Sequence, residues 1–165
     1  MTHQTQAATS SAVIVTPGGF LEHWLGHRAL TRRVIEAFPE DQLFTFSAAP
    51  PMRPFGVMAW EIQQVGELTL NGLLTGQWTE PDWRQGSSTD RAELLGEWDI
   101  LSARLEREFS QVNLEQFGQP HHLPWGEMTG WVATIYAIDN EIHHRGQGYV
   151  SLRALGIEPP AFYER

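Results

Sequence analysis

The stretch "NEIHHRGQGYVSLRALGIEPP" (residues 140–160) has the features of the final turns of a long helix. Polar and apolar residues alternate at helical spacing, and no proline interrupts them until the last two positions. Gly156 is a typical helix C-terminal residue, and the prolines just beyond it prevent continuation. Followed back toward the N-terminus, the pattern predicts a helix from about Met128 to Leu155 that carries two adjacent histidines.

Three more segments show helical spacing of apolar residues. They are residues 19–38, residues 54–76 with proline in the first turn, and a segment from Thr89 as N-cap to about Val112. The stretch "NLEQFGQPHHLPWGEMTG" (residues 113–130) is predicted as a long loop that runs into the start of the last helix. No segment convincingly resembles a strand, so we expect an all-α antiparallel four-helix bundle. Residues 1–17 are expected to form a flexible N-terminal arm, and residues 18–165 a single domain.

The composition narrows the classes of function. The 165 residues are 41% hydrophobic and 19% charged, which is typical of one soluble domain, here expected in the cytoplasm. A net charge of −9 argues against nucleic-acid binding, and no apolar run is long enough for a membrane span. Cysteine is absent, so any metal site must use nitrogen and oxygen ligands.

One carboxylate occupies an unexpected position in the second predicted helix. Glu61 lies in the middle of the apolar stripe formed by Val57, Met58, Val65 and Leu68. A carboxylate on a core face is costly unless it is paired, protonated or bound to a metal. We therefore consider two alternatives, a metal ligand or a salt bridge to an arginine of another helix, with Arg145 as one candidate.

The last predicted helix has two different faces. His144 shares one face with Asn140 and Ser151, and the small residues Ala133, Ala137 and Gly148 fall on the same side. The opposite face carries Ile135, Ile138, Ile142 and Tyr149. This pattern predicts that the isoleucine face packs against the core and that the small, polar face borders a cavity.

Glu61, Asn140 and His144 form a candidate metal set. Two groups spaced i and i+4 on one helix can bind one ion, and a carboxylate from another helix can complete its coordination. The alternative is that His144 is an ordinary hydrogen-bonded histidine. His143 is rotated by about 100° from His144 on the helix, so we expect it to face away. The predicted pocket and supporting residues are His143, Arg145, Gln147, Ser151 and Trp125. Arg145 is considered either as an anion-binding group or as part of a salt bridge.

In the stretches "NEIHHRGQGYVSLRALGIEPPAFYER" and "PMRPFGVMAWEI" the chain resembles the DinB/YfiT-like superfamily of metal-dependent proteins. The resemblance implies a four-helix bundle with one long crossover, often dimeric, and a divalent metal held by three histidines. His144 matches the last of these histidines, whereas Glu61 and Asn140 stand at the other two positions. This harder donor set favours Mn, Fe, Mg or Ca over Zn or Ni.

The resemblance also implies a function. Several relatives transfer a small-molecule thiol such as bacillithiol to an electrophile, or catalyse related hydrolysis or isomerisation. We therefore expect a metal-dependent enzyme that is a homodimer and takes a small-molecule thiol or electrophile. The alternative is a non-catalytic member of the fold that binds a small molecule or a partner and has lost its metal.

Overall fold

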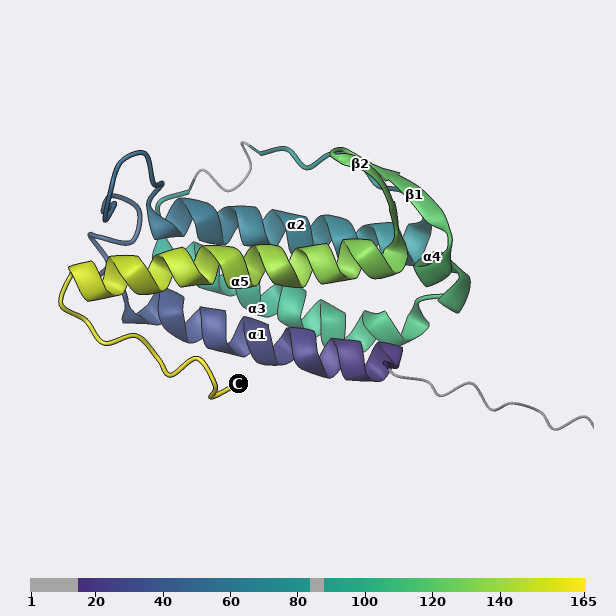
Figure 1. Cartoon of the computed structure of the whole chain (residues 1–165), viewed down its shortest axis with the longest axis horizontal. Helices are drawn as coiled ribbons and strands as arrows, with labels where there is room; N and C mark the ends of the chain where they lie inside the picture. Colours follow the sequence, from purple (N-terminus) through teal and green to yellow (C-terminus); the bar gives the residue numbers. More distant parts are fainter. Residues whose placement is uncertain (1–14, 84–87) are drawn as a thin grey trace, which may run out of the picture.

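A computed structural model of the chain describes residues 15–83 and 88–165. Its four long helices are α1 (Pro17–Ala37), α2 (Phe55–Thr75), α3 (Arg91–Glu108) and α5 (Gly130–Ala154) (Figure 1). The all-α prediction is confirmed. Of the predicted N-terminal arm, residues 1–14 lie outside the described residues. No helix in the described part of the chain is both long and apolar enough to cross a membrane.

The helices form a bundle in which consecutive helices are not always neighbours. Helix α2 packs against α3 and α5, and α1 packs against the same two helices from the opposite corner. Figure 1 shows α2 and α3 running in the same direction, whereas α2 and α5 are antiparallel. The connection from α2 to α3 must therefore return along the bundle, which is the predicted long crossover.

Side-chain caps fix the helix boundaries close to their predicted positions. Thr16 accepts a hydrogen bond from the Gly19 amide at the start of α1, and Thr129 caps α5 in the same way. Gly76 and Gly156 have φ angles of 73° and 75° just after α2 and α5. The prediction of Thr89 as the α3 cap was wrong. Asp90 fills that role and accepts hydrogen bonds from two amides of the first turn.

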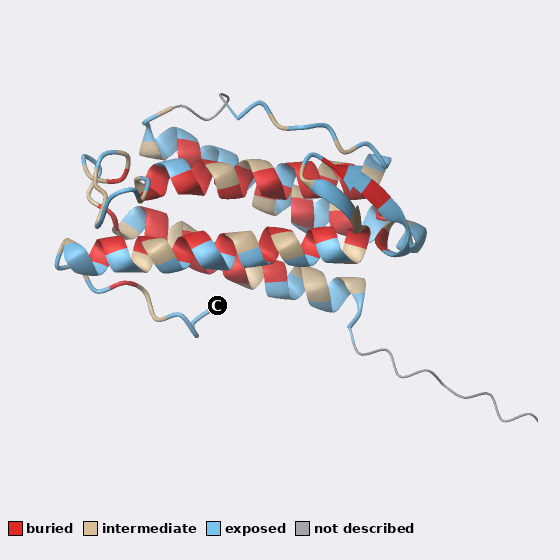
Figure 2. Cartoon of the chain, turned by 45° about the horizontal axis from the view of Figure 1, so that its top comes forward, coloured by how far each residue is buried: buried red, intermediate tan, exposed pale blue. Residues whose placement is uncertain are grey.

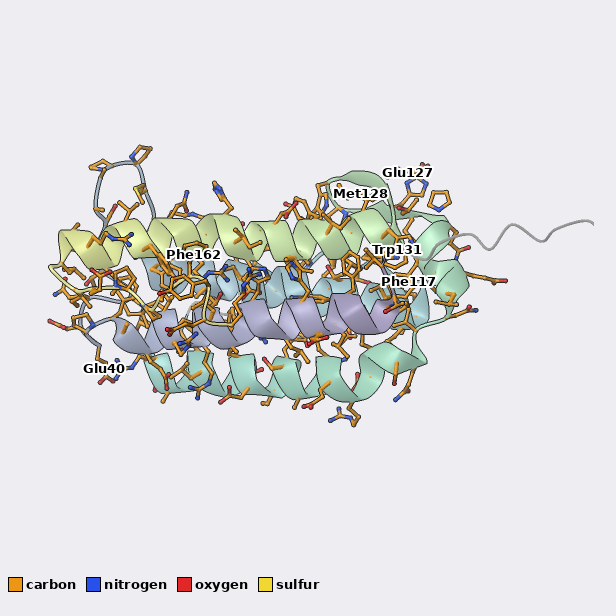
Figure 3. All side chains as sticks on the ribbon, turned by 60° about the horizontal axis from the view of Figure 1, so that its bottom comes forward. Glu40, Phe117, Glu127, Met128, Trp131 and Phe162 are labelled. Carbon is orange, nitrogen blue, oxygen red and sulfur yellow. The ribbon has the colours of Figure 1, made fainter. Side chains whose placement is uncertain are left out.

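Residues 109–129, predicted to be the end of the third helix and a loop, contain four short elements. A 3-10 turn (Phe109–Gln111) and helix α4 (Leu114–Gly118) precede strands β1 (Pro120–Leu123) and β2 (Gly126–Thr129), which pair in antiparallel register. Each strand has only four residues, too few for a periodic sequence signal. Figure 3 shows Phe117 and Trp131 together at this end of the bundle, with ring centroids 4.7 Å apart. These contacts attach the short elements to α5.

The core-facing side of α5 was predicted incorrectly. Ala133, Ala137 and Gly148 are buried, whereas Ile135 and Ile142 are 44% and 39% exposed, although Ile138 of the same predicted face is buried. Figure 2 shows buried residues on the sides of the helices that face one another. Small residues let α5 approach α2 closely, and the Phe55 ring packs against Gly148. The apolar isoleucines were therefore a misleading guide to the buried face.

This close approach gives a testable prediction. A Cβ added at Gly148 would lie 2.6 Å from Phe55 Cε2, so Gly148→Ala should lower the free energy of unfolding by about 1–3 kcal/mol. The matched control is Gly146→Ala, because nothing lies within 4 Å of a Cβ there. Alanine in a helix interior should then stabilise by about 0.5–1 kcal/mol. Urea unfolding of both variants measures the difference, and equal effects would contradict the packing described here.

Candidate functional site: an acid–imidazole pair beside an aromatic cavity

Glu61 and His144 meet between α2 and α5. Glu61 Oε1 lies 3.0 Å from His144 Nε2, although the residues are 83 positions apart in sequence. The His144 side chain is 8% exposed and that of Glu61 is 25% exposed, so the pair lies at the edge of the buried core. The antiparallel packing of these two helices brings these two of the three positions of the predicted metal set to the same level of the bundle.

Asn140 lies beside this pair, one helical turn before His144. Its Nδ2 is 3.5 Å from Glu61 Oε1, at the outer limit of a hydrogen bond. Its Oδ1 is buried and has no hydrogen-bond partner among the described residues. A buried carbonyl oxygen without a partner is costly, so this atom is available to an ion, a water molecule or a ligand.

Arg53 is a partner of Glu61 that the sequence did not reveal. Its Nη2 lies 2.6 Å from Glu61 Oε2, and its side chain is 50% exposed. The hydrogen bond from His144, followed by that from Arg53, lowers the pKa of Glu61 to about 2. Glu61 is therefore ionised at neutral pH, and its salt bridge is to Arg53 rather than to the suggested Arg145.

The two adjacent histidines face different surroundings, as expected from their helical positions. His144 is buried, whereas His143 is exposed. Gln147 connects them: its Oε1 lies 3.0 Å from His144 Nδ1, and its Nε2 lies 3.3 Å from His143 Nε2. This glutamine orients the His144 ring, so it serves as a supporting residue.

Two predicted pocket residues lie elsewhere. Arg145 is buried and points toward α1, where it donates hydrogen bonds to Thr31 Oγ1 (2.9 Å) and His27 Nδ1 (2.9 Å). Ser151 is fully buried, and its Oγ has no partner within the described part of the chain. Neither residue lines the cavity next to Glu61. The face of α5 that is turned toward α1 thus carries a separate buried polar network, in which Arg145 lies with His27 and Glu141.

His27 in this network makes the stability of the fold depend on pH. Burial, followed by the charge of Arg145, lowers its pKa from 6.5 to about 3. The unfolded chain therefore takes up a proton between pH 6.5 and 3 that the folded chain does not bind. Stability should fall as the pH decreases through this window, by at most about 1.4 kcal/mol per pH unit from this group.

Urea unfolding at several pH values between 7 and 4 tests this dependence. The wild-type chain should lose stability more steeply than His27→Gln, because glutamine cannot take up a proton. Parallel curves for the two proteins would show that His27 does not contribute as described.

A cavity of about 630 Å³ lies beside Glu61. Its lining comes from α2, α5, the connections on either side of α2, and the turn between β1 and β2. The lining residues are Phe44, Arg53, Val57, Trp60, Glu61, Gln64, Val65, Trp83, Ser88, Thr89, Trp125 and Tyr136. Trp125, one of the predicted pocket residues, is part of this lining, and its ring lies tilted against that of Tyr136, with ring centroids 5.0 Å apart. Glu61 belongs both to the cavity wall and to the acid–imidazole pair.

Tyr136 and Arg53 were missed for different reasons. Tyr136 lies four residues before Asn140 and eight before His144, so helical spacing places it on the same face of α5. That signal was present in the sequence. Arg53 lies in the irregular connection before α2, where no periodicity predicts the direction of a side chain.

The residues present fit a hard divalent cation in donor type, although they are few. Among residues 15–83 and 88–165, no group of three or more His, Asp or Glu side chains could hold a metal ion. The set here has two such residues, Glu61 and His144, and the orphaned amide oxygen of Asn140 would be the third donor. An anionic oxygen, an amide oxygen and an imidazole suit Mn, Fe, Mg or Ca better than a soft metal.

The fold places the chain among four-helix-bundle proteins, and solved structures share this architecture. A DinB-like protein from Bacillus subtilis superposes with a TM-score of 0.71 at 22% identity, covering 88% of this chain and 97% of that one. A DinB-like protein from Bacillus cereus gives 0.71 at 23% identity, with the same coverage. YfiT from Bacillus subtilis, described as a probable metal-dependent hydrolase with an unusual four-helix bundle topology, gives 0.70 at 13% identity, covering 94% and 95%.

The family model of the DinB family matches residues 4–165. The chain therefore belongs to the DinB family, as the resemblance in residues 140–165 had indicated. No curated protein matches the sequence.

Proposed function

We propose that this protein is a metal-dependent enzyme of the DinB type that transfers a small-molecule thiol to an electrophile. The observation that carries the proposal is the meeting of Glu61 Oε1 and His144 Nε2 at 3.0 Å, beside the unpartnered Oδ1 of Asn140. These three donors would hold a divalent cation. When bound, such an ion supplies Lewis acidity that lowers the pKa of a coordinated thiol or water.

The chain's own residues have distinct roles in this proposal. Glu61 supplies negative charge at neutral pH, because its pKa is about 2. Gln147 holds the His144 ring through Nδ1 and leaves Nε2 directed at the site. The chain contains no cysteine, so the sulfur nucleophile must arrive with a cosubstrate. The description of YfiT as a probable metal-dependent hydrolase supports metal chemistry in this fold, with water in place of the thiol.

One observation favours the alternative, a small-molecule binder without a metal. Arg53 Nη2 occupies Glu61 Oε2 at 2.6 Å, so a cation already neutralises this carboxylate. An incoming metal ion would have to tolerate or displace that guanidinium. If the protein binds a small molecule without a metal, the hydrogen bond between Glu61 and His144 has a structural role at the wall of the cavity.

Elemental analysis of protein purified without a metal-affinity tag separates the two functions. The enzyme should contain about one divalent metal per chain, and Glu61→Ala and His144→Ala should each lose it. Turnover of a low-molecular-weight thiol with a chromogenic electrophile should stop on chelation and return with added Mn²⁺. Protein that contains no metal and gains none on titration would instead establish the binder.

We further propose that the protein is a cytoplasmic homodimer. The exposed side of α5 carries Val132, Ile135, Ile142 and Val150, which are 39–52% exposed. Apolar side chains at this spacing on one helix face are typical of an association surface. Light scattering should give twice the chain mass of 18.7 kDa, and Ile142→Glu should give the single-chain mass.

A further inference from the structure

The walls of the cavity next to Glu61 are mainly aromatic. Rings of Phe44, Trp60, Trp83, Trp125 and Tyr136 reach it from five separate parts of the chain. Two of the indoles are fixed by hydrogen bonds: Trp60 Nε1 donates to Ser88 O at 3.0 Å, and Trp83 Nε1 donates to Glu80 Oε1 at 3.2 Å. Fixed flat rings around 630 Å³ provide a preformed surface for a flat apolar ligand of small-molecule size.

The cavity wall carries few charged side chains. Among the lining residues that the structure describes, Arg53 and Glu61 are the ones whose side chains carry a formal charge. The Glu61 carboxylate is engaged on both oxygens, by His144 and by Arg53. The guanidinium uses only Nη2 in that pair, and no other hydrogen bond links Arg53 to the residues that the structure describes. Its remaining N–H donors are therefore available at the half-exposed entrance.

From this arrangement we propose that the cavity binds a flat aromatic molecule with a single carboxylate, which pairs with the free donors of Arg53. A planar guanidinium matches the two oxygens of a carboxylate and makes charge-assisted hydrogen bonds to them. The aromatic body packs between the indole and phenol rings. The overall charge of −9 and the presence of one guanidinium among the lining residues that the structure describes disfavour multiply charged anions.

The inference deepens the proposed function, since Glu61 places such a ligand next to the proposed metal position. Only the identification of this ligand as the electrophile depends on the proposed function. Binding itself needs the rings and Arg53, neither of which requires a metal. The two proposals can therefore fail separately.

Calorimetric titration of the full chain at pH 7.5 in the presence of a chelator tests the inference with three probes. 2-Naphthoate has the ring and the charge, 2-naphthalenemethanol has the ring alone, and cyclohexanecarboxylate has the charge alone. We expect 2-naphthoate to bind at one site per chain, at least about tenfold more tightly than either of the other probes. Equal affinities, or no saturable 1:1 binding of 2-naphthoate, would overturn the inference.

Variants assign the binding to this cavity. Arg53→Gln should weaken 2-naphthoate about tenfold and leave 2-naphthalenemethanol unchanged, whereas Trp83→Leu should weaken both ring-containing probes. The matched control is Arg107→Gln, since Arg107 is 62% exposed and lies outside the cavity lining. Unchanged 2-naphthoate affinity in Arg53→Gln would overturn the role of the guanidinium. If Arg53→Gln does not fold, the comparison of the three probes on the wild-type chain still tests whether the cavity requires both a ring and a carboxylate. Metal-free protein that binds 2-naphthoate supports the inference even where elemental analysis rejects the enzyme.

Discussion

Glu141→Ala is expected to lower the free energy of unfolding by about 3–5 kcal/mol, the effect of breaking a buried ion pair on one side. Glu141 is fully buried, and its Oε1 accepts a hydrogen bond from Thr31 Oγ1 at 2.6 Å. Arg145 Nη1 lies 3.8 Å from the same oxygen, and Arg28 is also buried and attracts this carboxylate. Alanine would leave two buried guanidinium groups without the acid that offsets their charge.

The conservative variant Glu141→Gln separates the charge from the hydrogen bond. Glutamine keeps the volume and an acceptor for Thr31 but removes the negative charge. Burial raises the pKa of Glu141, an effect that the charge of Arg28 opposes. We expect Glu141→Gln to lose less stability than alanine. Urea unfolding of the three proteins measures both steps, and a loss below about 1 kcal/mol in Glu141→Ala would contradict this view of the network.

The second large effect is expected at the candidate site. His144→Ala should weaken Mn²⁺ binding at least about 100-fold, since changes even to groups that merely support a ligand cost 10- to 100-fold. The adjacent histidine is a matched control. His143 is exposed, and its side chain meets the site through Gln147 and through an edge contact with the His144 ring, with ring centroids 5.0 Å apart. His143→Ala should therefore change the affinity by no more than about threefold.

Mn²⁺ titration followed by electron paramagnetic resonance measures free and bound ion directly for both variants. Equal losses in His143→Ala and His144→Ala would show that the adjacent pair acts through the helix surface rather than through one inward-facing ring. Retention of wild-type affinity in His144→Ala would exclude His144 as a ligand.

The sequence predicted those parts of the structure that repeat with helical spacing. Glu61 stood out because a carboxylate in an apolar stripe needs a compensating partner, and His144 stood out because it shares a face with Asn140. Both inferences use periodicity within a helix, and the structure brings these three residues together. The caps at Gly76 and Gly156 were predictable for the same local reason.

What the sequence could not predict depends on how the helices face one another. Periodicity showed that α5 has two different faces, but not which one is buried. Gly148 lies inside because the Phe55 ring fills the space that a side chain at position 148 would occupy. Ile135 is consequently exposed. The direction of Arg53 and the position of Trp83 depend on irregular connections, where no repeat constrains a side chain. Apart from Trp125, which was predicted as a pocket residue, and Tyr136, whose helical spacing was a usable signal, the aromatic lining of the cavity was therefore visible only in the structure.

The most direct test of the site is anomalous scattering from crystals equilibrated with Mn²⁺, with data collected on both sides of the manganese absorption edge. We expect one anomalous peak per chain that contacts the Glu61 carboxylate and the Nε2 of His144, with the amide oxygen of Asn140 turned toward it. Saturating Mn²⁺ that leaves no peak there, with Glu61 still hydrogen-bonded directly to His144, would contradict it.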